Sequence, residues 1–394
     1  MNNKILVFNA GSSSLKFSVF SVCQQASLKL LFAGEFSRFG MGWNLKTKPA
    51  KYKKEYQKDL SLGKLVDQTF DILEQEFGQD LDPIGIGHRI VHGGRDFSEP
   101  VFLSQSIILQ LEKNIALAPL HQPSILEVIA AAIKRKPQIR QIGCFDTGFH
   151  KTQNPLNRVI AIPKKYTDLG IQNYGFHGLS YQYVSSVLQA NNLFSSDAKI
   201  VIAHLGSGAS LCAIKNFSSV ATSMGFSPLG GLIMGTRPGT LDPAVVFFLQ
   251  DNLGLSVREI EHILYKESGL KAVSEGFSSM RELLEKDNDA CRLAVDLFVQ
   301  KAIREIGSLI AELKGLDGLV FTGGIGENSA LIRHRISQGL SWLGLELCQH
   351  SNLSALSTEN ISIISTAESK ISAMVVSTDE NIVIAEAAAR LAQS

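Results

Sequence analysis

The stretch ILVFNAGSSSLKFSVF, residues 5–20, decides the fold. Residues 5–8 are an apolar run typical of a buried strand, and residues 15–20 alternate like a half-buried strand. The turn between them, residues 9–14, consists of small and hydroxyl-bearing side chains, and Lys16 follows it. Such a turn suits a phosphate group or a Mg-nucleotide. It is equally compatible with an ordinary hairpin, because Asn, Gly and Ser are common turn residues.

The same arrangement recurs about halfway along the chain. Residues 199–205 form a second apolar strand pattern, the turn Gly-Ser-Gly-Ala-Ser covers 206–210, and residues 211–214 are again β-like. This repetition predicts two related halves that face one another. Strand and helix patterns alternate along most of the chain, so the predicted class is α/β. We expect one domain from residues 1–150 with 379–394, and a second from 151–378.

Composition excludes several functional classes. The 394 residues are 45% apolar and 19% charged, which is typical of a globular chain long enough for two domains. A net charge of +1 favours neither nucleic acid nor an anionic membrane as a partner. No apolar run has the length of a membrane span and no secretory signal is visible, so a cytoplasmic location is predicted. The five cysteines show no metal-binding spacing, and the basic segment 46–58 is predicted to be a solvated, mobile insertion.

The remaining elements follow from hydrophobic periodicity and cap signals. Helices are predicted at 60–77, 106–118, 124–132, 289–314, from residue 329 onward, and 380–392, and strands at 84–87, 139–145, 318–321 and 373–377. The sequence Gly-Gly-Ile-Gly-Glu-Asn at 323–328 joins a strand to a helix, where free N–H groups favour anions. Neither GxxxxGK[ST] nor GxGxxG occurs, so a Walker loop and a dinucleotide fold are not supported.

Two arginines lie among glycines in apolar surroundings, where an unpaired charge would be costly. Arg89 is in GHRIVHGG and Arg237 is in MGTRPG. Their guanidinium groups suit a two-point grip on a carboxylate or on a transferring phosphoryl group. The alternative is a structural salt bridge to a carboxylate such as Asp146, which ends a buried strand.

Six histidines lie in or beside glycine- or proline-containing turns, without the spacing of a zinc site: His88, His92, His121, His150, His177 and His204. Each is by default a hydrogen-bonded structural residue. His177 is the exception, because flanking glycines hold it in a constrained loop from which it could donate to phosphoryl oxygens. Glu380 could serve Mg²⁺. A favourable charge at the start of the last helix explains it more simply.

These residues together resemble the acetate kinase family, within the acetate and sugar kinase, Hsp70 and actin superfamily. The resemblance covers nearly the whole chain and rests on eight ordered motifs: NAGSSSLK (9–16), GHRIVHGG (87–94), APLHQP (118–123), FDTGFH (145–150), YGFHG (174–178), HLGSGAS (204–210), MGFSPLGGLIMGTR (224–237) and GGIGEN (323–328).

The resemblance implies two ribonuclease-H-like, actin- or hexokinase-like domains with an interdomain cleft. It implies reversible in-line transfer of the ATP γ-phosphoryl to acetate, giving acetyl phosphate and ADP, with Mg²⁺ or Mn²⁺ required and a homodimer expected. Propionate or another short-chain acid is the alternative acceptor. An ATP-dependent conformational module without an acyl acceptor is the alternative from another class.

The resemblance also implies roles for individual residues. Asn9 and Glu380 would serve the metal, Arg89 and Arg237 would hold the carboxylate and the phosphoryl group, Asp146 would orient them, and His177 would stabilise the transition state. The acyl methyl would lie against Val91, Leu120, Phe176 and Pro228. The nucleotide would be held by Ser12, Ser14, Lys16, His204, Leu205, Gly206, Ser207, Gly208, Ser279, Met280, Arg281, Gly324, Ile325, Gly326, Glu327 and Asn328.

A carboxylate acceptor is already ionised at neutral pH, so this reaction needs alignment and charge neutralisation rather than a strong base. The chain departs from the family pattern at Ser207, where asparagine is usual, and at Ser279, where an acid is usual. Gly230 replaces a usual glutamate, and Pro238 with Thr240 replace a usual serine and aspartate. These departures bear on nucleotide preference and efficiency more than on the type of reaction.

Overall fold

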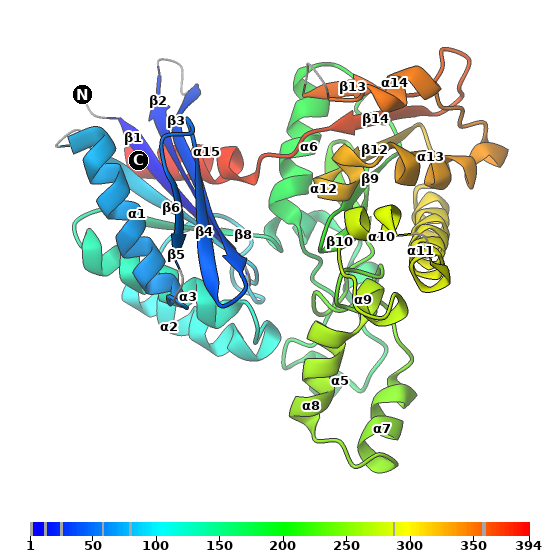
Figure 1. The fold of residues 1–394 in the computed structure, drawn as a ribbon, viewed down its shortest axis with the longest axis horizontal. Coiled ribbons are helices and arrows are strands. Elements are labelled where there is room, and N and C mark those ends of the chain that lie inside the picture. Colours follow the sequence, from blue (N-terminus) through cyan, green and yellow to red (C-terminus); the bar gives the residue numbers. More distant parts are fainter. Residues whose placement is uncertain are drawn as a thin grey trace. The chain divides into compact units, whose positions relative to one another are not determined.

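The computed structural model describes residues 3–11, 14–23, 27–56, 59–78, 81–286, 288–356 and 360–394. The chain divides into two compact units. Unit 1 comprises Met1–Phe149 and Asp379–Ser394, and unit 2 comprises His150–Thr378. The last helix of the chain therefore belongs to the unit that contains the first strand (Figure 1).

The described part of unit 1 contains an eight-stranded sheet in the order β5-β4-β3-β2-β1-β6-β8-β7. The strands are β1 (Lys4–Ala10), β2 (Ser14–Val22), β3 (Leu28–Phe39), β4 (Gly42–Lys48), β5 (Lys53–Tyr56), β6 (Pro83–Ile90), β7 (Val101–Phe102) and β8 (Gln141–Phe145). Strands β1 to β5 form an antiparallel meander, whereas β1, β6 and β8 are parallel. The register of β1 and β2 puts Asn9 opposite Lys16 across the first turn.

Helices cover both faces of this sheet. They are α1 (Leu62–Phe77), α2 (Gln105–Lys113), α3 (Gln122–Arg135) and α15 (Glu380–Gln393). On one face, the Phe8 ring of β1 lies 5.9 Å from Phe70 of α1. On the other face, a Cβ at Gly87 of β6 would lie 2.5 Å from the Ile384 side chain of α15. Only a glycine at this position lets α15 pack so closely on the sheet.

Unit 2 contains, in its described residues, a six-stranded sheet in the order β11-β10-β9-β12-β14-β13. The strands are β9 (Ile200–Leu205), β10 (Ala209–Lys215), β11 (Ser218–Thr222), β12 (Gly318–Thr322), β13 (Ile361–Ile363) and β14 (Ser372–Val376). Strands β9, β10 and β11 are antiparallel, and β9, β12 and β14 are parallel. The order β11-β10-β9-β12-β14 thus repeats β3-β2-β1-β6-β8 of unit 1, as the repeated turn predicts.

The helices of unit 2 are mostly short, apart from α11. They are α4 (Pro155–Arg158), α5 (Lys164–Thr167), α6 (Gly178–Ala190), α7 (Pro243–Asp251), α8 (Val257–His262), α9 (Gly269–Val273), α10 (Met280–Glu285), α11 (Asp289–Leu313), α12 (Gly323–Asn328), α13 (Ala330–Gln338) and α14 (Gln349–Leu353). Asn288 caps α11 by accepting a hydrogen bond from the Cys291 N–H at 2.8 Å, and Lys314 ends it in the left-handed region. Short 3-10 turns cover Asn114–Leu117, Gly148–Thr152 and Ser341–Leu343, and a π-helical turn covers Ile263–Glu267.

Two sequence predictions are wrong. The basic segment 46–58 is not simply a mobile insertion, because residues up to Tyr56 supply part of β4 and all of β5 at the edge of the sheet. The second concerns 323–328, which was expected to be a turn before a helix. These residues are themselves the helix α12. Among the helices of the described residues, none is long and apolar enough to cross a membrane.

Candidate active site

In unit 1, Arg89 and Asp146 form a buried ion pair where two parallel strands end. Arg89 is the penultimate residue of β6, and Asp146 directly follows β8, with its N–H donating to the Ile90 carbonyl at 2.9 Å. The Arg89 Nη2 donates to Asp146 Oδ2 at 2.7 Å, and its Nε lies 3.1 Å from both carboxylate oxygens. The Asp146 side chain is 1% exposed. The salt bridge considered as an alternative for Arg89 is therefore present.

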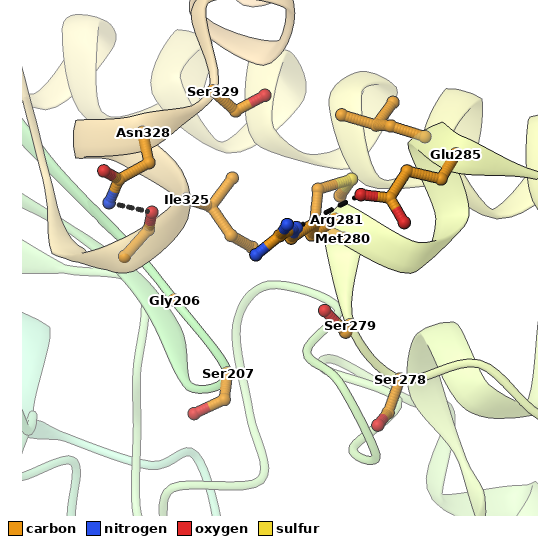
Figure 2. A pocket seen from close by; sticks show the side chains of 12 residues that line it. Gly206, Ser207, Ser278, Ser279, Met280, Arg281, Glu285, Ile325, Asn328 and Ser329 are labelled. Carbon is orange, nitrogen blue, oxygen red and sulfur yellow. Dashed lines mark hydrogen bonds and ion pairs between the residues drawn. The ribbon is translucent and has the colours of Figure 1, made fainter. Parts of the chain in front are cut away.

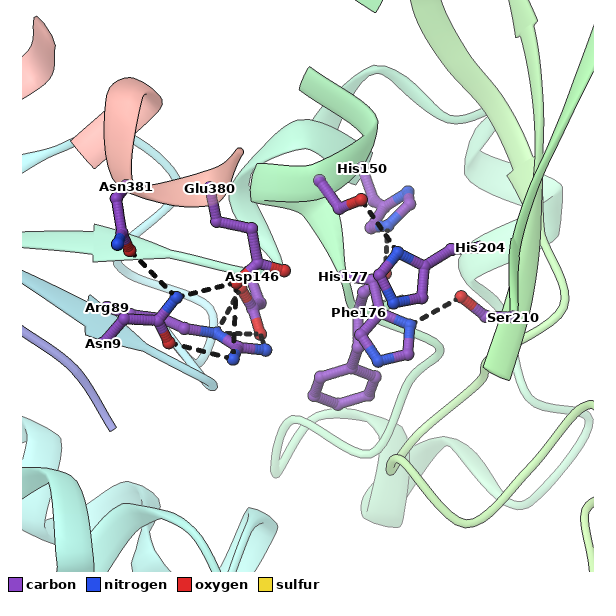
Figure 3. Close-up of polar contacts among 11 residues, drawn as sticks. Asn9, Arg89, Asp146, His150, Phe176, His177, His204, Ser210, Glu380 and Asn381 are labelled. Carbon is purple, nitrogen blue, oxygen red and sulfur yellow. Dashed lines mark hydrogen bonds and ion pairs between the residues drawn. The ribbon is translucent and has the colours of Figure 1, made fainter. Parts of the chain in front are cut away.

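Asn9 and Glu380 join this pair from β1 and from the start of α15 (Figure 3). The Arg89 Nη1 donates to Asn9 Oδ1 at 3.2 Å and lies 3.5 Å from Glu380 Oε2. The Asn9 amide in turn donates to Glu380 Oε2 at 2.9 Å and to Asn381 Oδ1 at 3.3 Å. Arg89 thus lies among three predicted site residues: Asn9 and Glu380, predicted to serve the metal, and Asp146, predicted to orient the reacting groups.

The charges of this cluster act on one another. Burial alone would lower the pKa of Arg89, but the Asp146 and Glu380 carboxylates outweigh it, and the pKa is raised. Burial raises the pKa of Asp146 to about 6, with Arg89 acting in the opposite direction. No group of three or more His, Cys, Asp or Glu side chains suited to a metal occurs among the described residues. Amide and carboxylate oxygens from Asn9 and Glu380 nevertheless fit Mg²⁺, which takes few protein ligands when substrate phosphates and waters complete its shell.

In unit 2, Arg237 and His177 approach the same glycine. A Cβ at Gly208, in the turn between β9 and β10, would lie 2.8 Å from Arg237 Nη2 and 3.1 Å from His177 Nε2. Only a glycine lets both side chains come this close to the turn. A cationic group and an imidazole nitrogen therefore border one small region above the turn.

Arg237 has a different environment from Arg89. Its Nη1 donates to the Pro228 carbonyl at 2.7 Å, and no ion pair involves it among the described residues. Burial lowers the pKa of Arg237 to about 10. Two backbone hydrogen bonds hold the loop that carries Arg237. The Gly235 N–H donates to the Ser207 carbonyl, and the Met234 N–H donates to the Arg237 carbonyl. A rigid loop thus holds a partly buried guanidinium that lacks a carboxylate partner in the described part of the chain.

The backbone holds His177 in an unusual conformation. Its φ of 58° lies in the left-handed region, immediately before α6. His150 fixes the preceding residue, because its Nε2 donates to the Phe176 carbonyl at 2.9 Å. The His177 ring stacks on His204 with centroids 4.4 Å apart, and its Nδ1 contacts Ser210 Oγ at 2.8 Å (Figure 3). The imidazole is therefore held in one orientation, with Nε2 directed at the Gly208 turn.

A cavity of about 780 Å³ lies in the same unit (Figure 2). It is lined by Gly206, Ser207, Ser278, Ser279, Met280, Arg281, Leu284, Glu285, Gly324, Ile325, Asn328 and Ser329. Eight of these residues are among those predicted to hold the nucleotide. The volume and the lining suit a ligand the size of a nucleotide, and Gly324 and Ile325 of α12 form part of that lining.

Other predicted nucleotide residues do not line this cavity: His204, Leu205, Gly208, Gly326 and Glu327. Glu327 instead accepts hydrogen bonds from the N–H groups of Gly323 and Thr378, at 3.0 and 3.1 Å. The cavity also includes four residues that were not among the predicted nucleotide residues: Ser278, Leu284, Glu285 and Ser329. The Arg281–Glu285 pair of α10, at i and i+4, was the available signal for Glu285.

The remaining predicted residues are divided between the units. Lys16 is exposed on β2, Ser14 begins that strand, and Ser12 lies outside the described residues. Of the residues expected near the acyl methyl, Val91 and Leu120 belong to unit 1, and Phe176 and Pro228 belong to unit 2.

Two sheets with the same ribonuclease-H-like order, partly buried arginines and a nucleotide-sized cavity indicate the actin and hexokinase fold class and suit a phosphotransferase. Comparison with known proteins specifies the family. The model of the acetokinase family matches residues 4–386. Acetate kinase of Rickettsia felis is 42% identical over 391 residues, covering 98% of each chain.

Solved structures agree with this result. A propionate kinase from Francisella tularensis has a TM-score of 0.88 at 35% identity, covering 98% of each chain. Acetate kinase of Porphyromonas gingivalis has a TM-score of 0.85 at 32% identity, covering 99% of each. The chain belongs to the acetokinase family and is a kinase.

Proposed function

We propose that this chain catalyses reversible transfer of the γ-phosphoryl group of ATP to acetate, giving acetyl phosphate and ADP. The observation that carries the proposal is the environment of Arg237. A partly buried guanidinium that lies beside the Gly208 turn and has no carboxylate partner among the described residues is suited to a phosphoryl group as its anion. Membership of the acetokinase family supports a phosphoryl group, in transfer to a carboxylate, as this anion.

In this proposal, unit 2 binds the nucleotide and stabilises the charge that develops during transfer. The cavity formed by the Gly206–Ser207 turn, α10 and the start of α12 takes the nucleoside and its phosphates. Arg237 and His177 contact the transferring group, because both reach the space above Gly208. The acetate carboxylate attacks the γ-phosphorus, and the bond from that phosphorus to the ADP oxygen breaks.

Unit 1 contributes the metal side and the acyl side of the reaction. Asn9 and Glu380 would hold Mg²⁺, which Mn²⁺ can replace, and the ion would neutralise phosphate charge. Arg89 and Asp146 act together, because their ion pair fixes the guanidinium that binds the acetate carboxylate. Val91, Leu120, Phe176 and Pro228 are the residues proposed to contact the methyl group.

The acyl acceptor is the first property to test. Solved relatives include both a propionate kinase and an acetate kinase, and one methylene changes selectivity by only ~1–3 kcal/mol in a hydrophobic site. Val91, rather than a smaller residue, favours acetate. Measuring kcat/KM for both acids with saturating MgATP decides this, and a clear preference for propionate would overturn the acetate assignment.

The transfer itself is tested by trapping acetyl phosphate as its hydroxamate. We expect product from ATP, Mg²⁺ and acetate together, and none when acetate is omitted. ATP hydrolysis at the same rate with and without acetate, with no hydroxamate above background, would instead favour a nucleotide-driven conformational module.

We also propose that the chain forms a homodimer through the α7 region of unit 2. This helix has no buried residue, and Val245, Phe247 and Phe248 are 40%, 62% and 56% exposed. Exposed aromatic groups at this density are typical of a surface that another chain covers. Light scattering of the wild type and of a Phe247→Asp, Phe248→Asp variant tests this, since only the wild type should have the mass of two chains.

A further inference from the structure

A chain of three polar groups leads from the core of unit 2 to the imidazole beside Arg237. The Tyr181 hydroxyl lies 2.5 Å from Ser210 Oγ, and Ser210 Oγ lies 2.8 Å from His177 Nδ1. Tyr181 is on α6 and Ser210 is on β10, and both are 0% exposed. Two buried hydroxyl groups are thus arranged in series behind the nitrogen of His177 that does not face the Gly208 turn.

The order of donors in this chain follows from the chemistry of the hydroxyl groups. A serine hydroxyl has one proton, so Ser210 can donate to His177 Nδ1 or to the Tyr181 oxygen, but not to both. The phenol is the more acidic hydroxyl and hence the better donor. Burial raises the pKa of Tyr181 well above its usual value, so the phenol keeps its proton at neutral pH. Tyr181 therefore donates to Ser210, which leaves the serine proton for His177 Nδ1.

We propose that Ser210 and Tyr181 are positioning residues that fix the neutral tautomer of His177 with its proton on Nε2. This inference rests on the proposed function, because it assigns the direction in which His177 acts on the transferring phosphoryl group. In this proposal Ser210 donates to Nδ1, which lies 2.8 Å away. The ring proton is then on Nε2, the atom beside Gly208 and Arg237.

The tautomer matters for catalysis because the reacting group is an anion. An Nε2–H donates to a phosphoryl oxygen, whereas the other tautomer would present a lone pair to that oxygen and repel it. A neutral donor also avoids placing a second positive charge beside Arg237. The stack on His204 and the left-handed backbone keep the ring in place while the hydroxyl chain selects its proton position.

The test is heteronuclear NMR of the full chain labelled with ¹⁵N-histidine, with His177→Asn used to assign the ring signals. We expect wild-type His177 in the Nε2–H tautomer. Ser210→Ala removes the donor and should shift the ring to a mixture of tautomers. Tyr181→Phe should shift it less, because the Ser210 hydroxyl remains but is free to turn. Ser185→Ala, which loses a buried α6 hydroxyl bonded to the Phe217 carbonyl, is the control that should change nothing.

Kinetics provide the second measurement. Ser210→Ala should lower kcat about 10- to 100-fold and Tyr181→Phe about 3- to 10-fold, the range of a misplaced donor, with KM for ATP and acetate within about twofold. In a His177→Ala background neither change should lower kcat further. If Ser210→Ala does not fold, Tyr181→Phe and the wild-type spectrum still decide the question.

The idea is overturned if wild-type His177 has its proton on Nδ1, if neither variant shifts the tautomer, or if a shifted tautomer leaves kcat unchanged. These results can be distinguished from a failure of the proposed function. If the proposed function is wrong, the wild-type protein makes no acetyl phosphate, but its NMR spectrum still shows which tautomer His177 adopts.

Discussion

Arg89 of unit 1 and Arg237 of unit 2 are both partly buried arginines near the strand ends of sheets with the same order, yet their partners differ. Arg89 makes a two-point contact with Asp146 and lies near Glu380. Arg237 has a backbone carbonyl and, in the described chain, no carboxylate. The pKa of Arg89 is accordingly raised, and that of Arg237 is lowered by burial to about 10.

This difference indicates how the same topology performs two tasks. In unit 1 the charges compensate one another, which fixes the side chains before any ligand binds. In unit 2 the partly buried Arg237 has no carboxylate partner among the described residues, which costs stability until an anion binds. Unit 1 thus orients its groups, whereas unit 2 is prepared for the charge of the phosphoryl group.

The largest effect should come from Arg237→Ala. We expect kcat to fall about 10³-fold or more, as for other arginines at a transferring phosphoryl group. The fold should be unaffected, because no buried carboxylate loses its partner. Steady-state kinetics with a thermal unfolding control measure both. Arg258→Ala is the matched control, since its side chain is 84% exposed and pairs only at the surface. Near-normal turnover of a folded Arg237→Ala variant would contradict the role of Arg237 at the phosphoryl group, and with it the proposed difference between the two arginines.

Arg89→Ala should instead reduce stability as well as activity. Its loss leaves Asp146 buried without a cation, for which about 3–5 kcal/mol of unfolding free energy is expected. Urea unfolding of this variant and of the Arg89→Ala, Asp146→Asn double variant is the measurement. The double variant should recover part of the loss. Equal stability of Arg89→Ala and Arg237→Ala would show that the two environments do not differ energetically.

Acid should affect the core of unit 1 through its buried histidines. Burial lowers the pKa of His88 and of His92 to about 4. It also lowers the pKa of His150, in unit 2, to about 4. Because an unfolded histidine has a pKa near 6.5, the unfolded chain binds more protons between pH 6.5 and 4. Stability present at pH 7 is therefore lost as pH falls through this window. Asp146, with its pKa raised to about 6, acts in the opposite direction.

A His88→Gln variant separates these contributions. Between pH 7 and pH 4, the unfolding free energy of the wild type should fall by up to ~3 kcal/mol more than that of the variant. Hydrogen exchange at each pH then reports the two units separately. Parallel pH curves for wild type and variant would contradict a neutral His88 in the folded chain.

The smallest effect concerns the two repeated turns. Ser207 lines the cavity of unit 2, so Ser207→Ala should raise KM for ATP about 2- to 10-fold, as expected for one lost hydrogen bond. Ser14→Ala in the turn of unit 1 should change that KM less. A larger effect of Ser14→Ala than of Ser207→Ala on KM for ATP would indicate that the first turn, rather than the turn of unit 2, binds the nucleotide.

Much of the fold was predictable because its signals are local. Apolar runs, caps and glycine turns predicted the main strands and the helices α1, α11 and α15. The edge hairpin was missed although its pattern was present. Trp43, Leu45 and Thr47 are buried at every second position, but charged residues between and after them resemble a solvated segment.

The candidate site was predictable only in part, for a physical reason. Arg89, Asp146 and His177 lie in glycine-containing or strand-end motifs, which are visible in sequence. The contacts among them join residues far apart in the chain. No local pattern could show that Tyr181 contacts Ser210, or that Arg89 has a carboxylate partner whereas Arg237 has none among the described residues.

The return of α15 to the first sheet has a consequence for synthesis. Unit 2 is inserted between two segments of unit 1, so the ribosome completes residues 150–378 before it makes 379–394. Unit 2 can fold early, while the sheet of unit 1 still lacks the helix that covers Gly87. Glu380 arrives with that helix. The order of translation thus delays the charged cluster around Arg89 until almost the whole chain has left the ribosome.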